Sequence, residues 1–521
     1  MSHSRRIARS GGFGKGRTPI SVKETHWRPG HWLYLLAIGT IATLTYGRGM
    51  TNPFVAEDFD WIASTLPRTD IGAYLAFQFR PLPIGITFLV HQFWGARPEA
   101  YHLLGLLLHI LCAISVFYCT LLLAQNRLVA LLAACIFVVY PRHHQAVLWV
   151  GANHNLFATG FCLLAVLGFI TYLQKENKWY WSVSVISFAL GLLSGEMVVT
   201  LVPVIACLEY MLFKQKGHSW RYFRRCGKYV PYLAILFLYG LISLWGKGAA
   251  RLSTENAGYH LTGWGLDEIK VFASYLIYLV FPHIPLRSLD VTFSTILLLS
   301  IAVLGLLAVW LKGSNLARFW VLWIALTLLP FVFFVPFGNA DRYFYLPSVG
   351  FAALWAVIGV QGYEYLKRFH KTFAKAVGLG LLAGYLLTSI AIAQQQINDW
   401  RISGEIAREC IDQVTDCYSE VESGSTFYVA NLPTQRGYAY IFLGGGFQGA
   451  LRLAYGDSSL KVFVTRDPSI VEEIRTAASH STASPGLYVF LFEGGRAIDY
   501  THGATALLDV LNSSLWYSPP W

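Results

Sequence analysis

Long apolar blocks are the feature that most constrains this chain. Eleven of them lie at roughly Trp32–Tyr46, Leu103–Leu123, Leu128–Tyr140, Leu156–Leu173, Trp179–Leu193, Met197–Leu212, Tyr229–Trp245, Phe293–Leu311, Phe319–Phe334, Val349–Tyr363 and Ala376–Ala393. Helices of such composition satisfy their own backbone hydrogen bonds and suit the hydrocarbon core of a bilayer. Only 13% of the residues are charged, against about 25% in soluble proteins. The sequence predicts an α-helical multi-pass membrane protein with about 11 transmembrane helices.

The basic residues give the expected orientation. They cluster at the N-terminus and in the connections at Arg127, Lys175–Lys178, Lys214–Lys228, Lys312–Arg318 and Lys367–Lys375. With eleven spans, all of these connections fall on one face, which the positive-inside rule makes cytoplasmic. The net charge of +11 is therefore attributed to membrane loops, and no nucleic-acid partner is expected. Residues 48–100, 141–155, 247–290 and 337–347 are expected outside a cell inner (plasma) membrane, as is everything after about residue 395.

Two apolar runs are too short or misplaced to be spans. Ile84–Trp94 is short, and Val271–Phe281 as a twelfth span would move Lys312 and Lys367 to the outer face. We expect both to be interfacial or re-entrant helices. No cleavage site follows the first apolar block, so we expect that block to remain as an anchor. The predicted domains are a cytoplasmic basic tail at 1–30, a transmembrane domain at 31–395 with its first outer loop at 48–100, and an extracytoplasmic domain at 396–521.

The last 126 residues or so differ in pattern from the rest. Alternating runs such as "STFYVANL", "YAYIFL", "LKVFVT" and "LYVFLF" predict strands, and a helix is expected after Asp467-Pro468. We therefore expect a small C-terminal α+β domain. "GGGFQG" at 444–449 contains the spacing GxGxxG, but no helix with a following acid completes a dinucleotide unit, so we interpret it as a turn. Cys410 and Cys417 could form a disulfide or remain free thiols.

The segment "VAEDFDWI" at 55–62 places three carboxylates among apolar and aromatic residues on the expected outer face. Polar residues from distant loops fall on the same face. They are Arg80, Arg142, His143, His144, His154, Asn155, Glu196, Asp341, Arg342 and Tyr345. Charged groups at the ends of spans are costly to bury, so the group indicates a site, although each residue alone could be a structural anchor.

Carboxylates facing Arg and His at a membrane surface suit transfer from a lipid-linked phosphate. Arg binds phosphate through two parallel hydrogen bonds. An acceptor hydroxyl needs a base, and a carboxylate whose pKa is adjusted by burial can take its proton. The predicted reaction is sugar transfer from a polyprenyl phosphate, which requires no nucleotide-binding fold.

Several motifs resemble those of a known family. "NPFVAEDFDWI", "FRPL" at 79–82, "YHLLGLLLH" at 101–109, "YPRHHQAVLWV" at 140–150, "LLSGE" and "ADRYFYLPSVG" occur in the family's order over about the first 400 residues. The sequence thus resembles the GT-C superfamily of polyprenyl-phosphate-sugar-dependent glycosyltransferases, in particular the bacterial relatives of the tetratricopeptide-linked O-mannosyltransferases. No tetratricopeptide repeat is found in the tail.

The resemblance implies an inverting glycosyltransferase whose donor is a polyprenyl-phosphate sugar and whose acceptor is a hydroxyl of a protein or of an envelope glycan or lipid. Its catalytic residues would be Asp58 and Glu57, either of which could be the base. The expected donor phosphate-binding residues are Arg80, Arg142, His143, Arg342 and Tyr345. Further site residues would be Asp60, His144, His154, Asn155, Glu196 and Asp341. The chain departs from the family at Gln145, where Glu is usual, at Gly195, where Lys is usual, and in lacking an Arg near Asn153.

We expect no cofactor, although a divalent cation is possible. His143, His144 and His154 could gather with Asp58 around a metal, but adjacent histidines rarely bind one ion together. Two other functions stay open. A transporter or flippase of a lipid-linked glycan would place its polar residues at the bilayer midplane in two related halves, and no half-repeat is evident. A non-catalytic scaffold would tolerate Asp58→Asn and Glu57→Gln.

Overall fold

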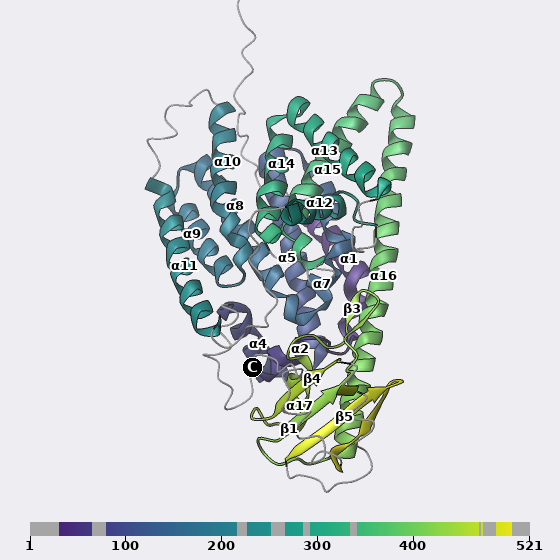
Figure 1. The fold of residues 1–521 in the computed structure, drawn as a ribbon. Helices are drawn as coiled ribbons and strands as arrows, with labels where there is room; N and C mark the ends of the chain where they lie inside the picture. Colours follow the sequence, from purple (N-terminus) through teal and green to yellow (C-terminus); the bar gives the residue numbers. More distant parts are fainter. Residues whose placement is uncertain are drawn as a thin grey trace, which may run out of the picture.

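A computed structural model describes residues 31–64, 80–215, 227–251, 266–284, 292–333, 341–467, 470–471 and 486–502. It consists of a bundle of helices with a small sheet at one end (Figure 1). The expected basic tail at 1–30 lies outside the described residues.

Each of the eleven apolar blocks falls mostly within one helix. These helices are α1 (His31–Tyr46), α5 (Pro98–Ala124), α6 (Arg127–Val138), α8 (His154–Lys175), α9 (Lys178–Leu192), α10 (Leu201–Gln215), α11 (Val230–Arg251), α13 (Phe293–Lys312), α14 (Asn315–Leu328), α15 (Pro347–Lys367) and α16 (Lys371–Cys417). The two shorter runs also form helices, α4 (Pro81–Trp94) and α12 (Leu266–Val280).

Four of the described helices are long and apolar enough to cross a membrane. They are Pro98–Ala124, Val150–Lys175, Phe293–Lys312 and Lys371–Cys417. A fifth span is obtained if Arg127–Val138 and Pro141–Leu148, which meet at a bend of 50°, are counted as one. The membrane-protein class is therefore supported, whereas the number eleven stays a prediction.

Close helix packing in the bundle depends on small residues. Ser184 of α9 donates to the carbonyl of Ala165 in α8 at 2.6 Å. A Cβ placed on Gly168 would lie 2.8 Å from the carbonyl oxygen of Tyr180 and 3.0 Å from the amide nitrogen of Ser184. The backbones of α8 and α9 are therefore in contact at Gly168, and no side chain fits between them.

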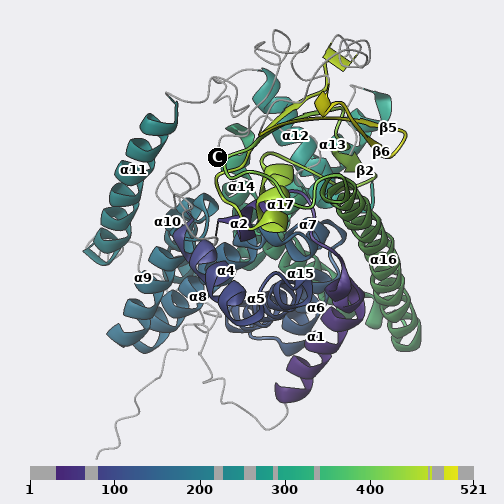
Figure 2. The same ribbon diagram turned by 90° about the horizontal axis from the view of Figure 1, so that it is seen from below.

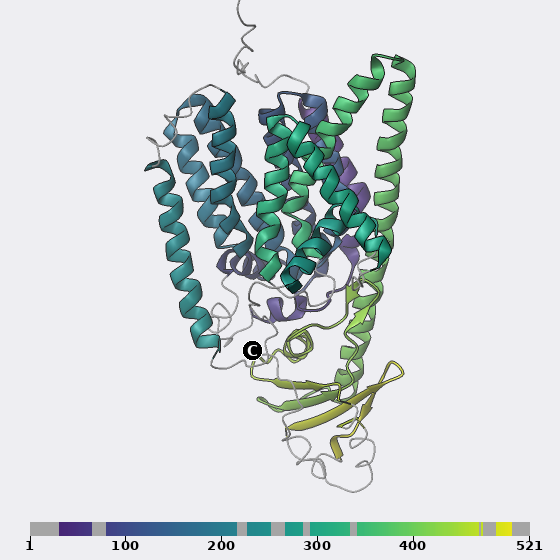
Figure 3. The ribbon, with the colours of Figure 1, turned by 45° about the horizontal axis from the view of Figure 1, so that its top comes forward.

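Helix α16 joins the bundle to the C-terminal sheet without interruption (Figure 3). It is 47 residues long, about 70 Å at 1.5 Å per residue. Its first residues follow the basic turn at Arg368–His370, and its last turns pack in the C-terminal domain. The boundary expected at 395/396 falls inside this helix.

The C-terminal sheet has the strand order β4-β1-β5-β6. Strands β1 (Thr426–Ala430), β4 (Lys461–Thr465) and β5 (Leu487–Glu493) are parallel, and β6 (Arg496–Asp499) is antiparallel to β5. Helix α17 (Gly446–Tyr455) lies between β1 and β4 in the chain and packs with α16 on one face of the sheet. The α+β prediction is confirmed for the described residues.

Three details of the tail refine the sequence analysis. "YAYIFL" contributes only β3 (Ala439–Tyr440), which pairs with β2 (Gln435–Arg436) in a separate hairpin. Of the helix expected after Asp467-Pro468, Ile470 and Val471 are helical, and most of the remainder lies outside the described residues. Cys410 and Cys417 are both free, because seven residues along one helix separate them by about 10 Å, beyond the reach of a disulfide.

We predict that Gly168→Ala lowers the stability of the protein by about 1–3 kcal/mol, because α8 and α9 must move apart to admit the methyl group. Gly384→Ala is the matched control, since it also lies in a helix and a Cβ there meets nothing within 4 Å. The thermal midpoints of both variants in detergent test this. Equal shifts in the two variants would contradict the packing argument.

Candidate functional site

The acidic segment forms a short helix, α2 (Asp58–Ala63), at the end of the bundle that carries the C-terminal domain (Figure 1). All six residues of α2 are buried. The amide of Ala56 donates to the carbonyl of Ile441 at 2.8 Å, which joins the segment to the C-terminal domain. Ala56 itself has a φ of 51°, a left-handed conformation that is uncommon for residues other than glycine. The segment is therefore held in one conformation and is not a solvated loop.

Asp58 is fully buried, and both of its carboxylate oxygens are engaged. Oδ1 accepts the amide of Gly151 at 2.7 Å, and Oδ2 accepts the amide of Val55 at 3.1 Å. Burial raises the pKa of Asp58 to about 8, although these backbone donors and that of Val150 oppose the effect. Asp58 therefore holds α2 to the turn η3 (Val150–Ala152) and presents no exposed edge to a solute.

Glu57 lies directly before α2 and is only half-buried. Burial raises the pKa of its carboxyl, and the positive charges of Arg342 and then Arg80 oppose that effect. Glu57 is thus the more accessible of the two adjacent acids, and the charges of two guanidinium groups act on its carboxyl.

Arg80 stands at the start of α4 and pairs with Glu196 of η4 (Glu196–Thr200) at 3.0 Å. Burial would raise the pKa of Glu196, but Arg80 and His154 lower it to about 2. This ion pair ties two expected site residues together beside Glu57.

His154 lies near the Arg80–Glu196 pair and contacts α2. Its ring stacks on Trp61 with centroids 6.2 Å apart, and its Nδ1 bonds the carbonyl of Gly151 at 2.9 Å. The side-chain amide of Asn155 lies 3.1 Å from His154 Nε2. His154 and Asn155 therefore support α2 and the Gly151 turn that binds Asp58.

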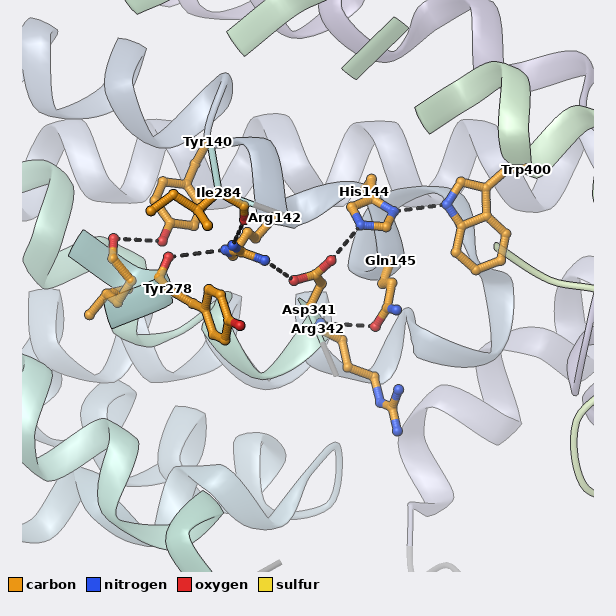
Figure 4. A network of polar contacts seen from close by, with 10 residues as sticks. Tyr140, Arg142, His144, Gln145, Tyr278, Ile284, Asp341, Arg342 and Trp400 are labelled. Carbon is orange, nitrogen blue, oxygen red and sulfur yellow. Dashed lines mark hydrogen bonds and ion pairs between the residues drawn. The ribbon is translucent and has the colours of Figure 1, made fainter. Parts of the chain in front are cut away.

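Arg142, His144 and Asp341 form a buried network (Figure 4). Arg142 Nη1 donates to Asp341 Oδ1 at 2.7 Å, and His144 Nε2 lies 2.8 Å from Asp341 Oδ2. Trp400 of α16 donates to His144 Nδ1 at 2.9 Å, so Nε2 of His144 carries the proton that Asp341 accepts. Burial would raise the pKa of Asp341, but Arg142 and His144 hold it below its ordinary value.

Arg342 follows Asp341 in the chain and is oriented by the same network. Its amide donates to Gln145 Oε1 at 3.2 Å, and its guanidinium lies over Trp149 and Tyr343, 5.0 Å and 4.8 Å from the ring centroids. Figure 4 shows its side chain pointing away from Arg142. The ion pair therefore fixes the backbone of η8 (Asp341–Phe344), and the charge of the adjacent Arg342 guanidinium lowers the pKa of Glu57.

His143 and Tyr345 are fully buried in an aromatic cluster with Phe137 and Tyr140. His143 Nε2 lies 2.8 Å from Ser348 Oγ, and the Tyr345 hydroxyl lies 2.7 Å from His109 Nδ1. The expected phosphate-binding set thus divides into two groups. Arg80 and Arg342 act on the pKa of Glu57 through their charges, whereas Arg142, His143 and Tyr345 are engaged in interior contacts.

The three histidines considered for a metal have different partners, namely Ser348, Asp341 and Gly151. In the parts of the chain that the structure describes, no group of three His, Cys, Asp or Glu side chains is arranged to hold a metal ion. That the protein needs no cofactor stays a prediction.

Some residues of the site were not singled out from the sequence. The sequence does not distinguish Trp149 and Trp400 from the other tryptophans among its 17, since aromatic residues are routine at membrane interfaces. Gln145 was noted only as a departure from the family motif, and its contact with Arg342 depends on the fold. The signal that could have pointed to Gly445, Gly446 and Gly449 was "GGGFQG", which we interpreted as a turn alone.

Comparison with known proteins supports the resemblance inferred from the motifs. The chain is 29% identical over 222 residues to the protein O-mannosyl-transferase TMTC1 of Homo sapiens, covering 39% of this chain and 23% of that protein. It is 28% identical over 147 residues to TMTC3 of Mus musculus, covering 27% and 15%, and 24% identical over 233 residues to TMTC4 of Homo sapiens, covering 37% and 30%. The similarity to these O-mannosyltransferases is thereby confirmed. The matches span less than a third of the relatives' length, and no family model matches the chain.

Two solved structures overlap most of the chain. An oligosaccharyltransferase of Archaeoglobus fulgidus, tethered to an acceptor peptide, gives a TM-score of 0.48 at 11% identity over 90% of this chain and 69% of that one. ArnT of Cupriavidus metallidurans, bound to undecaprenyl phosphate, gives 0.46 at 11% identity over 91% and 98%. Scores of this size carry no functional conclusion.

We predict that Arg142→Met destabilises the protein by about 3–5 kcal/mol, because it leaves the Asp341 carboxylate buried and unpaired. The double variant Arg142→Met/Asp341→Asn should recover part of that loss, since the buried charge is then gone. A double-mutant cycle of denaturation midpoints measures the coupling. Additive effects would show that the two side chains do not act as a pair.

Proposed function

We propose that the chain is an integral-membrane inverting glycosyltransferase that moves a sugar from a polyprenyl-phosphate donor to a hydroxyl acceptor on the extracytoplasmic side. One observation carries the proposal. A half-buried acid, Glu57, lies where the charges of Arg80 and Arg342 act on it, in a chain that is similar to O-mannosyl-transferases. A base beside two cations is what displacement of a phosphate by a hydroxyl requires.

Glu57 is the base in this proposal, and Asp58 is the residue that positions it. A general base must reach the proton that it removes. Glu57 is partly exposed, whereas Asp58 is fully buried with both oxygens accepting backbone amides. The raised pKa of Glu57 also brings the basicity of its carboxylate closer to that needed at neutral pH.

The reaction is a single displacement. The Glu57 carboxylate takes the proton of the acceptor hydroxyl while the hydroxyl oxygen forms a bond to the anomeric carbon of the sugar. The bond between that carbon and the phosphate oxygen breaks, and its electron pair stays on the phosphate. Attack opposite to the leaving group inverts the configuration.

Arg342 is the first candidate for the departing phosphate. Arg80 shares its charge with the carboxylate of Glu196 at 3.0 Å, whereas Arg342 is oriented by its backbone, by stacking on Trp149 and by a 3.4 Å hydrogen bond from Nη2 to the Tyr343 hydroxyl. A guanidinium that is held over an aromatic ring is oriented in advance for bidentate contact with a phosphate. No cofactor is required by this scheme, and loss of activity with a chelator would add a divalent cation to it.

The orientation rests on α16. Its N-terminal end follows the basic turn after Lys367, and its other end lies in the C-terminal domain, beside α2 (Figure 1). With the basic turn cytoplasmic, α2 and the C-terminal domain lie on the outer side of an inner (plasma) membrane. Mannose is the first sugar to test, since the relatives are O-mannosyl-transferases, and the acceptor is a protein or an envelope glycan or lipid.

We predict that Glu57→Gln lowers transfer at least 100-fold, since general base catalysis contributes about 10²–10⁴, while the thermal midpoint is kept. Purified protein with labelled polyprenyl-phosphate sugars and an envelope extract provides the assay. Glu409→Gln, an exposed acid on α16, is the matched control and should retain activity. Full transfer by Glu57→Gln would favour the scaffold. Movement of labelled lipid across vesicles, equal in wild type and variant, would favour the flippase.

The charge of Arg342 should also appear in the pH–rate profile. The active form of Glu57 is the carboxylate, so the rate rises as pH increases through its pKa. Arg342 lowers that pKa, so Arg342→Ala should move the acid limb to higher pH. Arg342→Lys keeps the charge and should leave the limb in place while lowering kcat roughly 10-fold through loss of bidentate contact. If the acid limb of Arg342→Ala stays at the wild-type pH, the charge of Arg342 does not act on the catalytic carboxylate.

A further inference from the structure

The glycine-rich turn "GGGFQG" at 444–449 packs directly against the acidic segment, and helix α17 begins within it (Figures 1 and 2). A Cβ on Gly446 would lie 2.0 Å from the carbonyl oxygen of Ala56. A Cβ on Gly449 would lie 2.5 Å from the amide nitrogen of Asp60. These distances leave no room for any side chain, so the close approach of α17 to α2 requires glycine at both positions.

Asp60 fills the start of α17. Its Oδ2 would lie 2.5 Å from a Cβ on Gly445, the residue that precedes the helix. The first turn of a helix has unpaired amide groups and a partial positive charge that favour an anion. A carboxylate of the same chain therefore lies against the residue that precedes α17.

Glu57 is in contact with the same turn. Gly444 has a φ of 52°, and a Cβ there would lie 3.1 Å from Glu57 Oε1. One residue earlier in the segment, the amide of Ala56 donates to the carbonyl of Ile441. Two residues after Glu57, the ring centroid of Phe59 lies 6.2 Å from that of Phe442. Residues 441–449 thus contact the acidic segment both before and after Glu57.

We propose that the turn at 444–449, which we call the glycine clamp, positions Glu57 for proton transfer by holding the acidic segment through Asp60 and the backbone of Ala56. The C-terminal domain therefore completes the reaction site. The inference rests on the proposed function for its catalytic part, whereas the clamp itself is a structural statement that can be tested without any activity.

The clamp also controls how much water reaches Glu57. The charged groups that act on the Glu57 carboxyl are Arg342 of η8 and Arg80, with Asp58 and Asp60 beside it on α2. Arg452 of α17 acts on Asp60. When α17 moves away, water replaces the clamp, and the pKa of Glu57 falls toward its ordinary value because burial is its main cause of elevation.

The test uses Gly449→Ala and Asp60→Asn in the full chain in detergent or nanodiscs. Hydrogen exchange of the amides in 54–64 should become at least 10-fold faster in both variants, while peptides of β1 and β5 keep their wild-type rates. Gly449→Ala is informative because alanine favours the helix itself, so a loss can only come from the contact. Gly384→Ala in α16, where a Cβ meets nothing within 4 Å, and Glu420→Gln at an exposed position of the C-terminal domain are the controls and should leave the segment protected.

Activity gives a second readout. In Gly449→Ala we expect kcat to fall 10- to 100-fold with little change in KM for the donor, and the acid limb of the pH–rate profile to move to lower pH. Unchanged exchange in 54–64, or equal acceleration in Gly384→Ala and Glu420→Gln, would overturn the clamp. Faster exchange in the two test variants, combined with no transfer by wild type from any donor, would keep the clamp and reject the proposed function.

Discussion

The hydrogen bond from the Gly151 amide to Asp58 is the interaction on which the rest of the site depends. It joins the segment after α1 to the turn between α7 (His144–Leu148) and α8, which is far from it in the chain. Because the carboxylate is fully buried, losing the amide partner would leave a desolvated acid without compensation, which is costly. The bond therefore fixes the position of α2, and with it the direction of Glu57.

A second set of buried charges fixes the backbone of Arg342, the cation with the largest effect on the pKa of this acid. Asp341 is held between Arg142 and His144, and Trp400 holds His144. These residues come from the bent pair of helices, from η8 and from α16, so three distant parts of the chain meet at one carboxylate (Figure 4). Arg342 emerges from this network with its guanidinium stacked on Trp149. Arg142, which was expected at the phosphate, thus helps to orient Arg342, whose charge acts on Glu57.

The two domains meet at the acidic segment. Asp58 bonds the helical bundle, whereas Ala56 and Asp60 contact the C-terminal domain. The segment carries a non-glycine residue in a left-handed conformation between these contacts. Such strain persists where the surroundings over-determine the backbone, and here the surroundings are supplied from both sides. The glycines of 444–449 have their role in this contact, since every larger residue would separate the two domains.

The sequence by itself determined the helical membrane class, the position of each long helix, the α+β tail and the acidic segment with Arg80 and Arg342. These follow from hydropathy, charge and local motifs, which act over one helix or one loop. Only the tertiary structure decided which acid is accessible, that Arg142, His143 and Tyr345 point into the interior, and that "GGGFQG" meets Asp60. Burial and pairing depend on residues far away in the chain: Arg142 and Asp341 are 199 positions apart. No local pattern reports the distance between their side chains, because that distance is set by how the helices pack.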